Sequence, residues 1–328
     1  MDLRGTGPTM VSTTELLRRS PNYDNASAIA EVDATNLTPY EFHNTYVLAH
    51  QPCVIRGAAA HWPAITNWDV GSLRAAVGET TMGVQSIGVL YEPLVEYSPK
   101  RLSATSPMTM NEFLDEIEGP RPRVQMYAER LTSLEQLSSD LGTFTGIDVS
   151  TRRARFYQDR FFLSRRGYTD WHVHTGDETL TAQLVGHKEF LLHEPAAMKT
   201  LLPMAKIGVW QTEPGAWPVS FASLVPRRVV LHPGDVIYIP MHWWHAVEAL
   251  GDSLNATYAH VFATPWRWMG DLRLQNVRFS VVAALGRSLI ESIRSRRPRQ
   301  LRHVARVLGT VVVGLPAALW HNRTKTGK

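Results

Sequence analysis

The chain has 328 residues, of which 44% are hydrophobic and 20% are charged, and this composition excludes a disordered, collagen-like or coiled-coil protein. The single cysteine, Cys53, excludes an internal disulfide, a zinc ribbon and an iron–sulfur cluster, so any metal must be held by histidines and carboxylates. The formal net charge of +4 arises in the tail, because residues 287–328 contain ten Lys and Arg against one acidic residue.

The first third of the chain combines predicted helices with a short strand. Three stretches place apolar side chains at helical spacing after a cap residue, namely residues 37–50, 69–77 and 109–117. Residues 52–55 are typical of a short buried strand. Residues 1–36 are expected to be a lead segment, and because Met1–Leu17 lacks the apolar run of a signal peptide, we expect a cytoplasmic protein.

From about residue 155 the pattern changes to short β-type runs separated by Gly, Pro and Asp. These runs are residues 155–163, 179–185, 188–194, 227–232, 235–240, 245–250 and 253–262. Many short strands at close intervals favour a sandwich or barrel over a βαβ sheet. We therefore expect a mainly β domain at residues 37–265, with N-terminal α/β elements, a barrel core at about 155–262 and helices after it.

The tail, residues 266–328, combines a helical pattern with the basic charge. Apolar residues recur every three or four positions from Leu272 to Ile293, which predicts helices. The longest uncharged apolar run, Val307–Trp320, is shorter than the roughly 18–20 residues that span a bilayer. Three roles stay open for this tail: a homodimer interface, which the Gly and Ala content of the apolar helix favours, a membrane surface, or a nucleic-acid contact.

Two segments carry candidate metal ligands. In the first, His172 and His174 are two residues apart on a predicted strand, so both imidazoles point to one face. In the second, Pro233 and Gly234 form a turn, an alternating strand follows, and His245 comes where the chain bends back. His-x-His followed by Gly-x5-Pro-x4-His is the two-part cupin metal signature. Four further histidines are not at ligand spacing and are expected to be structural: His187, His193, His232 and His260.

Three segments in the same order resemble the cupin-like branch of the JmjC-type oxygenases. YTDWHVHTGDETLTAQLVGHKEF resembles the first metal-binding strand of JmjC lysine demethylases and hydroxylases. PGDVIYIPMHWWHAVE resembles the last metal strand of asparaginyl and related protein hydroxylases, and PCVIRGAAAHWPAITNWDVGSL resembles their N-terminal element. The resemblance covers roughly residues 38–262 and implies a double-stranded β-helix that uses Fe(II) and 2-oxoglutarate.

The resemblance also implies roles for individual residues. His172 and His245 match the two histidine ligands of the family. Thr169 matches a threonine that hydrogen-bonds the co-substrate carboxylate, and Lys188 matches the lysine that pairs with it, as a dianion in a closed barrel requires. Three aromatic residues flank the ligands and are candidates for the substrate pocket: Trp171, Tyr238 and Trp243.

One position departs from the family pattern. The family has Asp or Glu two residues after the first histidine, where this chain has His174. Three accounts stay open. The metal site has three histidines; a carboxylate of Asp177 or Glu178 is a further ligand, since His-x-His-x3-Glu is the older cupin pattern; or the site is degraded in a binding protein.

These observations lead to one main functional hypothesis and two alternatives. The main one is an Fe(II)-dependent oxygenase that uses 2-oxoglutarate to hydroxylate a small molecule, an amino acid or a peptide. The first alternative is a three-histidine cupin dioxygenase that does not use 2-oxoglutarate. The second is a catalytically silent JmjC-like scaffold whose basic tail recruits partners. Related hydroxylases dimerise through C-terminal helices, so we expect a homodimer.

Overall fold

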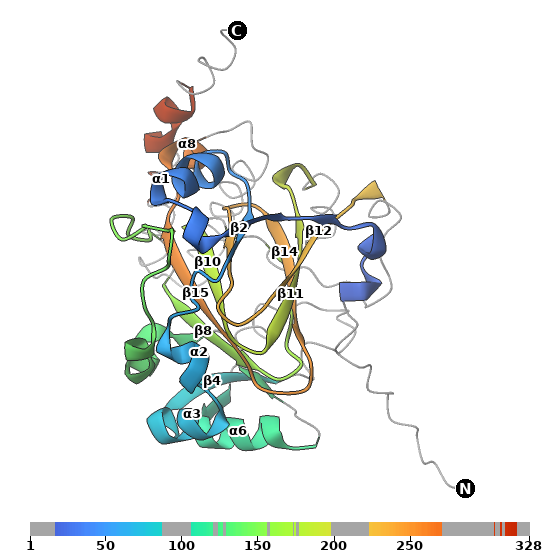
Figure 1. Ribbon diagram of the computed structural model, residues 1–328, viewed down its shortest axis with the longest axis vertical. Helices are drawn as coiled ribbons and strands as arrows, with labels where there is room; N and C mark the ends of the chain where they lie inside the picture. Colours follow the sequence, from blue (N-terminus) through green and yellow to red (C-terminus); the bar gives the residue numbers. More distant parts are fainter. Residues whose placement is uncertain are drawn as a thin grey trace, which may run out of the picture.

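The computed structural model describes residues 17–86, 106–120, 124–126, 129–155, 158–172, 174, 177–197 and 223–270, together with 305, 309 and 312–319. Two β-sheets face each other, and helices lie at both ends of this pair (Figure 1). The prediction of a mainly β jelly roll with flanking helices is confirmed. The helices predicted between residues 272 and 293 lie outside the described residues.

The larger sheet has seven strands in the order β2-β3-β13-β10-β15-β8-β7. Their bounds are Ala30–Asp33 (β2), Cys53–Arg56 (β3), Val236–Ile239 (β13), Asp177–Val185 (β10), Asn255–Ala263 (β15), Arg160–Ser164 (β8) and Glu129–Arg130 (β7). β10 is central and pairs antiparallel with β13 on one side and β15 on the other. Its residues 177–184 are all buried, because both faces of this sheet are covered.

The smaller sheet has five strands in the order β1-β12-β11-β14-β9. Their bounds are Ser27–Ala28 (β1), Arg227–Leu231 (β12), His187–His193 (β11), Trp244–Leu250 (β14) and Tyr168–His172 (β9). β1 pairs with β12 and β2 pairs with β3, so residues 27–33 of the predicted lead segment take part in both sheets. The seven predicted β runs correspond to β8 and to β10 through β15.

A further layer covers the outer face of the seven-stranded sheet. It consists of β5 (Ser106–Thr109), β4 (Thr81–Ser86), β6 (Val124–Met126), α2 (Pro63–Asn67), α3 (Val70–Val77) and α6 (Met110–Glu118). α3 and α6 confirm two predicted helices, and reciprocal hydrogen bonds of Asp69 and Thr109 cap them. The helix predicted at 37–50 is α1 (Pro39–Glu41), capped by Thr38, followed by the π-helical η5 (Phe42–Val47).

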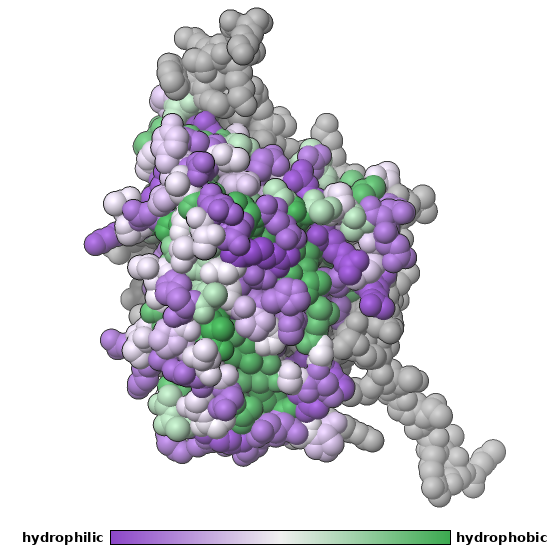
Figure 2. All heavy atoms as spheres, in the orientation of Figure 1, coloured by the Kyte–Doolittle hydropathy of each residue, from purple (hydrophilic) through white to green (hydrophobic). Residues whose placement is uncertain are grey.

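Each face of the seven-stranded sheet is covered by its own cluster of apolar side chains. One cluster joins Ile237 and Ile239 of β13 to Phe190 and Leu192 of β11, so it fills the space between the sheets, which we call the barrel interior. The other contains Tyr238 of β13 and lies under the outer layer. Each such fully buried side chain contributes roughly 1.5–3 kcal/mol. On the face shown in Figure 2, hydrophilic residues surround an apolar band that runs down the middle of the view.

Helices also mark the two ends of the barrel. Asp177 at the start of β10 lies opposite Ala263 at the end of β15, and α8 (Trp266–Gly270) follows at that end, near α1 (Figure 1). α3 and α6 lie at the other end. Within the described residues, no helix combines the length and apolarity that crossing a membrane requires.

Candidate metal centre

The register of β10 shows which of its side chains face the barrel interior. Thr179 and Thr181 lie opposite Ile239 and Ile237 of β13, and both isoleucines belong to the interior cluster. Directly opposed residues of antiparallel strands share a face, so the two threonines face the interior, and alternation adds Gln183 to them. The inner face of β10 therefore presents a polar row to the space between the sheets.

His174 and His245 come together at the end of the barrel where β10 begins. Their ring centroids are 4.8 Å apart and their planes are nearly perpendicular. Nδ1 of His245 lies 3.0 Å from the carbonyl oxygen of Trp243, which can only accept, so Nδ1 carries the proton and Nε2 carries the lone pair. Nδ1 of His174 lies 2.7 Å from the hydroxyl of Thr179, and this contact orients the ring.

His172 lies directly opposite His245 in the pairing of β9 with β14. The structure describes the backbone of His172 and not its side chain. Among the described side chains, no group of three or more His, Cys, Asp and Glu is arranged to hold a metal. The structure thus brings two of the predicted ligands together and sets the backbone of the third beside them, and the complete ligand set stays a prediction.

A register shift in the pairing of β9 with β14 explains how Thr169 comes to lie opposite an interior residue. Thr169 lies opposite Val247, and His172 lies opposite His245, with an irregularity between the two pairs. Val247 packs on the interior cluster. In a regular strand, residues three apart point to opposite faces, so the shift is what sets both Thr169 and His172 against interior positions.

Lys188 is buried in the barrel interior. Its Nζ donates to the hydroxyl of Thr257 at 2.7 Å and lies 5.6 Å from the ring centroid of Phe162. Burial lowers the pKa of Lys188 to about 7. No ion pair joins it to a carboxylate of the described residues. A buried ammonium without a counter-anion is costly, and a dianionic co-substrate would supply that counter-anion.

Glu178 points to the other face of β10. It neighbours Thr179, which faces the interior, and its Oε2 accepts hydrogen bonds from the hydroxyl of Tyr238 and the backbone N–H of Met241. Burial raises the pKa of Glu178 to about 7. Asp177 accepts a hydrogen bond from the backbone N–H of Arg155. The structure does not bring the Glu178 carboxylate to the two histidines.

The three aromatic residues predicted for the substrate pocket lie in three different places. Trp171 stacks on His193, which alternates with the interior residue Leu192 and so lies on the outer face of the five-stranded sheet. Tyr238 lies on the outer face of the seven-stranded sheet. Trp243 belongs to the interior cluster, and its Nε1 donates to the carbonyl of His50.

The four histidines without ligand spacing have neighbours of other kinds. His260 pairs with Asp159 at 2.9 Å, His187 and His232 pack edge to face, and His193 stacks on Trp171.

Sequence reasoning missed Thr179 and Thr257, the hydroxyl partners of His174 and Lys188. Both occupy interior positions on neighbouring strands. The alternation of Thr179, Thr181 and Gln183 with apolar residues is a signal in the sequence that could have indicated a polar interior row.

The residues present fit a metal and an anionic co-substrate. Neutral imidazoles suit Fe(II) among other first-row metals, and hydroxyl or carbonyl partners orient both described rings. The buried Lys188 on the same interior surface suits a carboxylate.

Several known proteins are similar to this chain over most of its length. Lysine-specific demethylase 8 of Xenopus tropicalis is 24% identical over 255 residues, covering 73% of this chain and 54% of that protein. The human bifunctional peptidase and (3S)-lysyl hydroxylase JMJD7 is 24% identical over 245 residues, covering 64% and 77%. Jumonji C domain-containing protein 5 of Drosophila melanogaster is 25% identical over 247 residues, covering 70% and 59%.

The chain spans about half the length of the first of these relatives. A match to the cupin-like domain family extends over residues 39–264, which include both metal motifs, Thr169 and Lys188. The chain therefore belongs to the cupin-like domain family, and it is similar in sequence to JmjC-type proteins.

Proposed function

We propose that this protein is an Fe(II)- and 2-oxoglutarate-dependent oxygenase. The observation that carries the proposal is the buried Lys188, which shares the barrel interior with His174 and His245 and has no carboxylate partner among the described residues. A metal site alone would need no such cation. A lysine ammonium in a low-dielectric interior is suited to one end of a dicarboxylate co-substrate.

Each residue has a defined task in this proposal. His172, His174 and His245 hold the iron, so this ligand set has a third imidazole in place of the family carboxylate. Lys188 and Thr169 hold the distal carboxylate of 2-oxoglutarate. Iron and co-substrate together supply the activated oxygen for hydroxylation. The apolar interior keeps water away, which strengthens the contact between Lys188 and the carboxylate.

We propose a peptide or amino-acid side chain as the substrate. The relatives carry names of lysine demethylases and of a lysyl hydroxylase, which act on side chains of proteins. The name of the human relative includes a lysyl hydroxylase, which supports hydroxylation as the reaction.

Anaerobic titration of the purified protein with Fe(II) and 2-oxoglutarate tests the proposal. We expect the visible absorption band of iron-bound 2-oxoglutarate, and succinate formation once air is admitted. Lys188→Met should abolish both and leave Fe(II) binding intact, since Lys188 is not a metal ligand. Iron binding without the band in the wild type would favour the three-histidine dioxygenase, and no metal binding at all would favour the scaffold.

We also propose that the protein is a homodimer formed through its C-terminal helices. Residues 312–319 are helical, and the exposed fractions of Val312, Val313 and Leu319 are 68%, 57% and 54%. Large apolar side chains at that exposure favour burial against another surface. Light scattering after size exclusion should give a dimer mass that is unchanged by salt and that falls to a monomer when the chain is truncated after residue 286. A monomeric full-length chain would refute this.

A further inference from the structure

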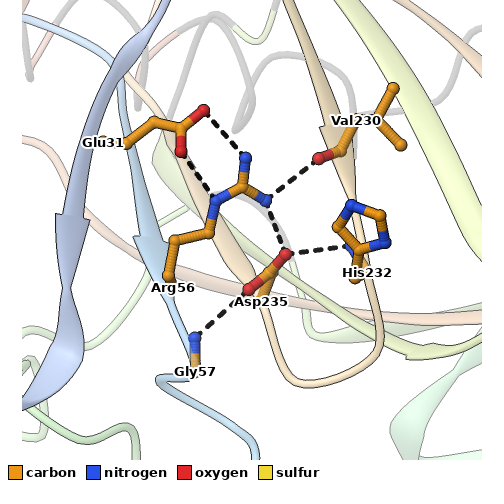
Figure 3. Close-up of polar contacts among 6 residues, drawn as sticks. All are labelled: Glu31, Arg56, Gly57, Val230, His232 and Asp235. Atoms are coloured by element: carbon orange, nitrogen blue, oxygen red, sulfur yellow. Dashed lines mark hydrogen bonds and ion pairs between the residues drawn. The ribbon is translucent and has the colours of Figure 1, made fainter.

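Two buried carboxylates hold the two ends of β13, the strand that leads to His245. At the far end from the histidines, Asp235 accepts hydrogen bonds from the guanidinium of Arg56 and from the backbone N–H groups of Gly57 and His232 (Figure 3). At the histidine end, Glu178 of β10 accepts hydrogen bonds from Tyr238 in β13 and from Met241 just after it.

The Glu178 side chain is completely buried. Its Oε2 lies 2.8 Å from the backbone N of Met241 and 3.0 Å from the hydroxyl of Tyr238. Its Oε1 has no hydrogen-bond partner among the described residues. Burying a carboxylate is costly, and its donors compensate only part of that cost, so the fold retains Glu178 at a penalty in stability.

Backbone hydrogen bonds help to hold the turn that follows β13. The backbone N–H of Met241 donates to Glu178, that of His242 donates to the carbonyl of His174 at 2.8 Å, and that of Trp243 donates to the carbonyl of Pro240. His242 has a φ of 70°, a left-handed conformation that is uncommon for a residue other than glycine and must be imposed by its surroundings.

His245 comes three residues after His242. The position of its ring therefore depends on where this turn is held, and a metal site tolerates displacements of only about 0.5 Å. The Glu178 side chain, on the strand next to His174, accepts a hydrogen bond from the backbone N–H of Met241. It therefore links the strand that carries one motif to the turn that precedes the other.

We propose that Glu178 is a positioning residue of the metal centre, which fixes the Met241–Trp244 turn so that His245 meets His174, and that it is not itself a metal ligand. This inference rests on the proposed metal site. The orientation of Glu178 supports this role. Its side chain lies on one face of β10, and Thr179, which contacts His174, lies on the other face.

Titration of the full-length protein with Co²⁺, followed by its ligand-field absorption, tests the role. Glu178→Ala should weaken Co²⁺ binding about tenfold or more, the range found when groups that orient metal ligands are removed. Glu178→Gln should stay within about threefold of the wild type, because its amide oxygen can still accept from Met241. Glu178→Asp keeps the charge but is one methylene too short for this contact, so it should resemble Glu178→Ala and serves if the alanine variant does not fold.

Asp235→Asn is the matched control, because Asp235 holds the other end of the same strand (Figure 3). It should lower the unfolding midpoint and leave the Co²⁺ affinity within about twofold. At saturating Co²⁺, all folded variants should show the wild-type band positions, since the ligands are unchanged.

Two results would overturn the inference while leaving the metal site standing. Equal Co²⁺ affinity of the wild type, Glu178→Ala and Glu178→Asp would remove any role for Glu178. A Glu178→Gln variant as weak as Glu178→Ala, with shifted bands, would make Glu178 a direct ligand. A wild-type protein that binds no Co²⁺ would instead refute the proposed metal site, and the inference with it.

Discussion

Replacing Lys188 by methionine should stabilise the ligand-free protein at neutral and acidic pH. Burial lowers the pKa of Lys188 from 10.5 to about 7, which at 1.36 kcal/mol per pKa unit is a penalty of about 5 kcal/mol on the buried ammonium. Methionine matches the length of the lysine stem but leaves the hydroxyl of Thr257 without its donor, which costs about 1 kcal/mol. The expected net gain is on the order of 4 kcal/mol.

This gain depends on pH in a defined direction. Below pH 7, Lys188 is charged in both the folded and unfolded states, so the wild type carries the full penalty. Between pH 7 and 10.5 the unfolded chain binds a proton that the folded protein has lost, so wild-type stability rises with pH and the advantage of the variant shrinks. We expect a large difference at pH 6.5 and one near zero at pH 9.5.

Urea unfolding at both pH values, with linear extrapolation to water, measures this difference. Thr257→Val is the control, because it removes the hydrogen bond and keeps the charge, and it should destabilise the protein at pH 6.5. A Lys188→Met variant that is less stable than the wild type by the same amount at both pH values would refute the reasoning, since Lys188 would then carry no penalty for 2-oxoglutarate to relieve.

Two further substitutions test the contact between Thr179 and His174 and the ion pair between Arg56 and Asp235. Thr179→Val removes the hydroxyl partner of His174 while keeping the side-chain shape, so Co²⁺ affinity should fall about tenfold and the free energy of unfolding by about 1 kcal/mol; an unchanged titration curve would contradict this. Arg56→Ala leaves the buried Asp235 carboxylate without its ion pair, so the free energy of unfolding should fall by about 2–3 kcal/mol in urea, while Co²⁺ affinity stays as in the wild type. Loss of affinity here would mean that the two ends of the barrel are coupled.

The features that the sequence determined by itself are those set by neighbouring residues. The caps at Asp69 and Thr109 and the helical spacing behind them depend on contacts within one turn. The seven β runs and the two metal motifs follow from alternation and spacing within single strands, and the motifs identified the family before any contact was known. Such local preferences do not depend on where a helix or strand lies in the folded protein.

The tertiary structure decided which faces meet. The register of β10 with β13 turns Thr179 toward the interior and Glu178 away from it, although the two are adjacent in the chain. The register shift between β9 and β14 sets Thr169 on the side of His172, which strand alternation alone would forbid. Hydrogen bonds between strands distant in the sequence fix these choices, because a slip of one residue reverses every side chain. Residue spacing in the sequence was therefore enough to predict the candidate ligands. Only the tertiary structure identified the groups that orient them, the Thr179 hydroxyl and the Trp243 carbonyl.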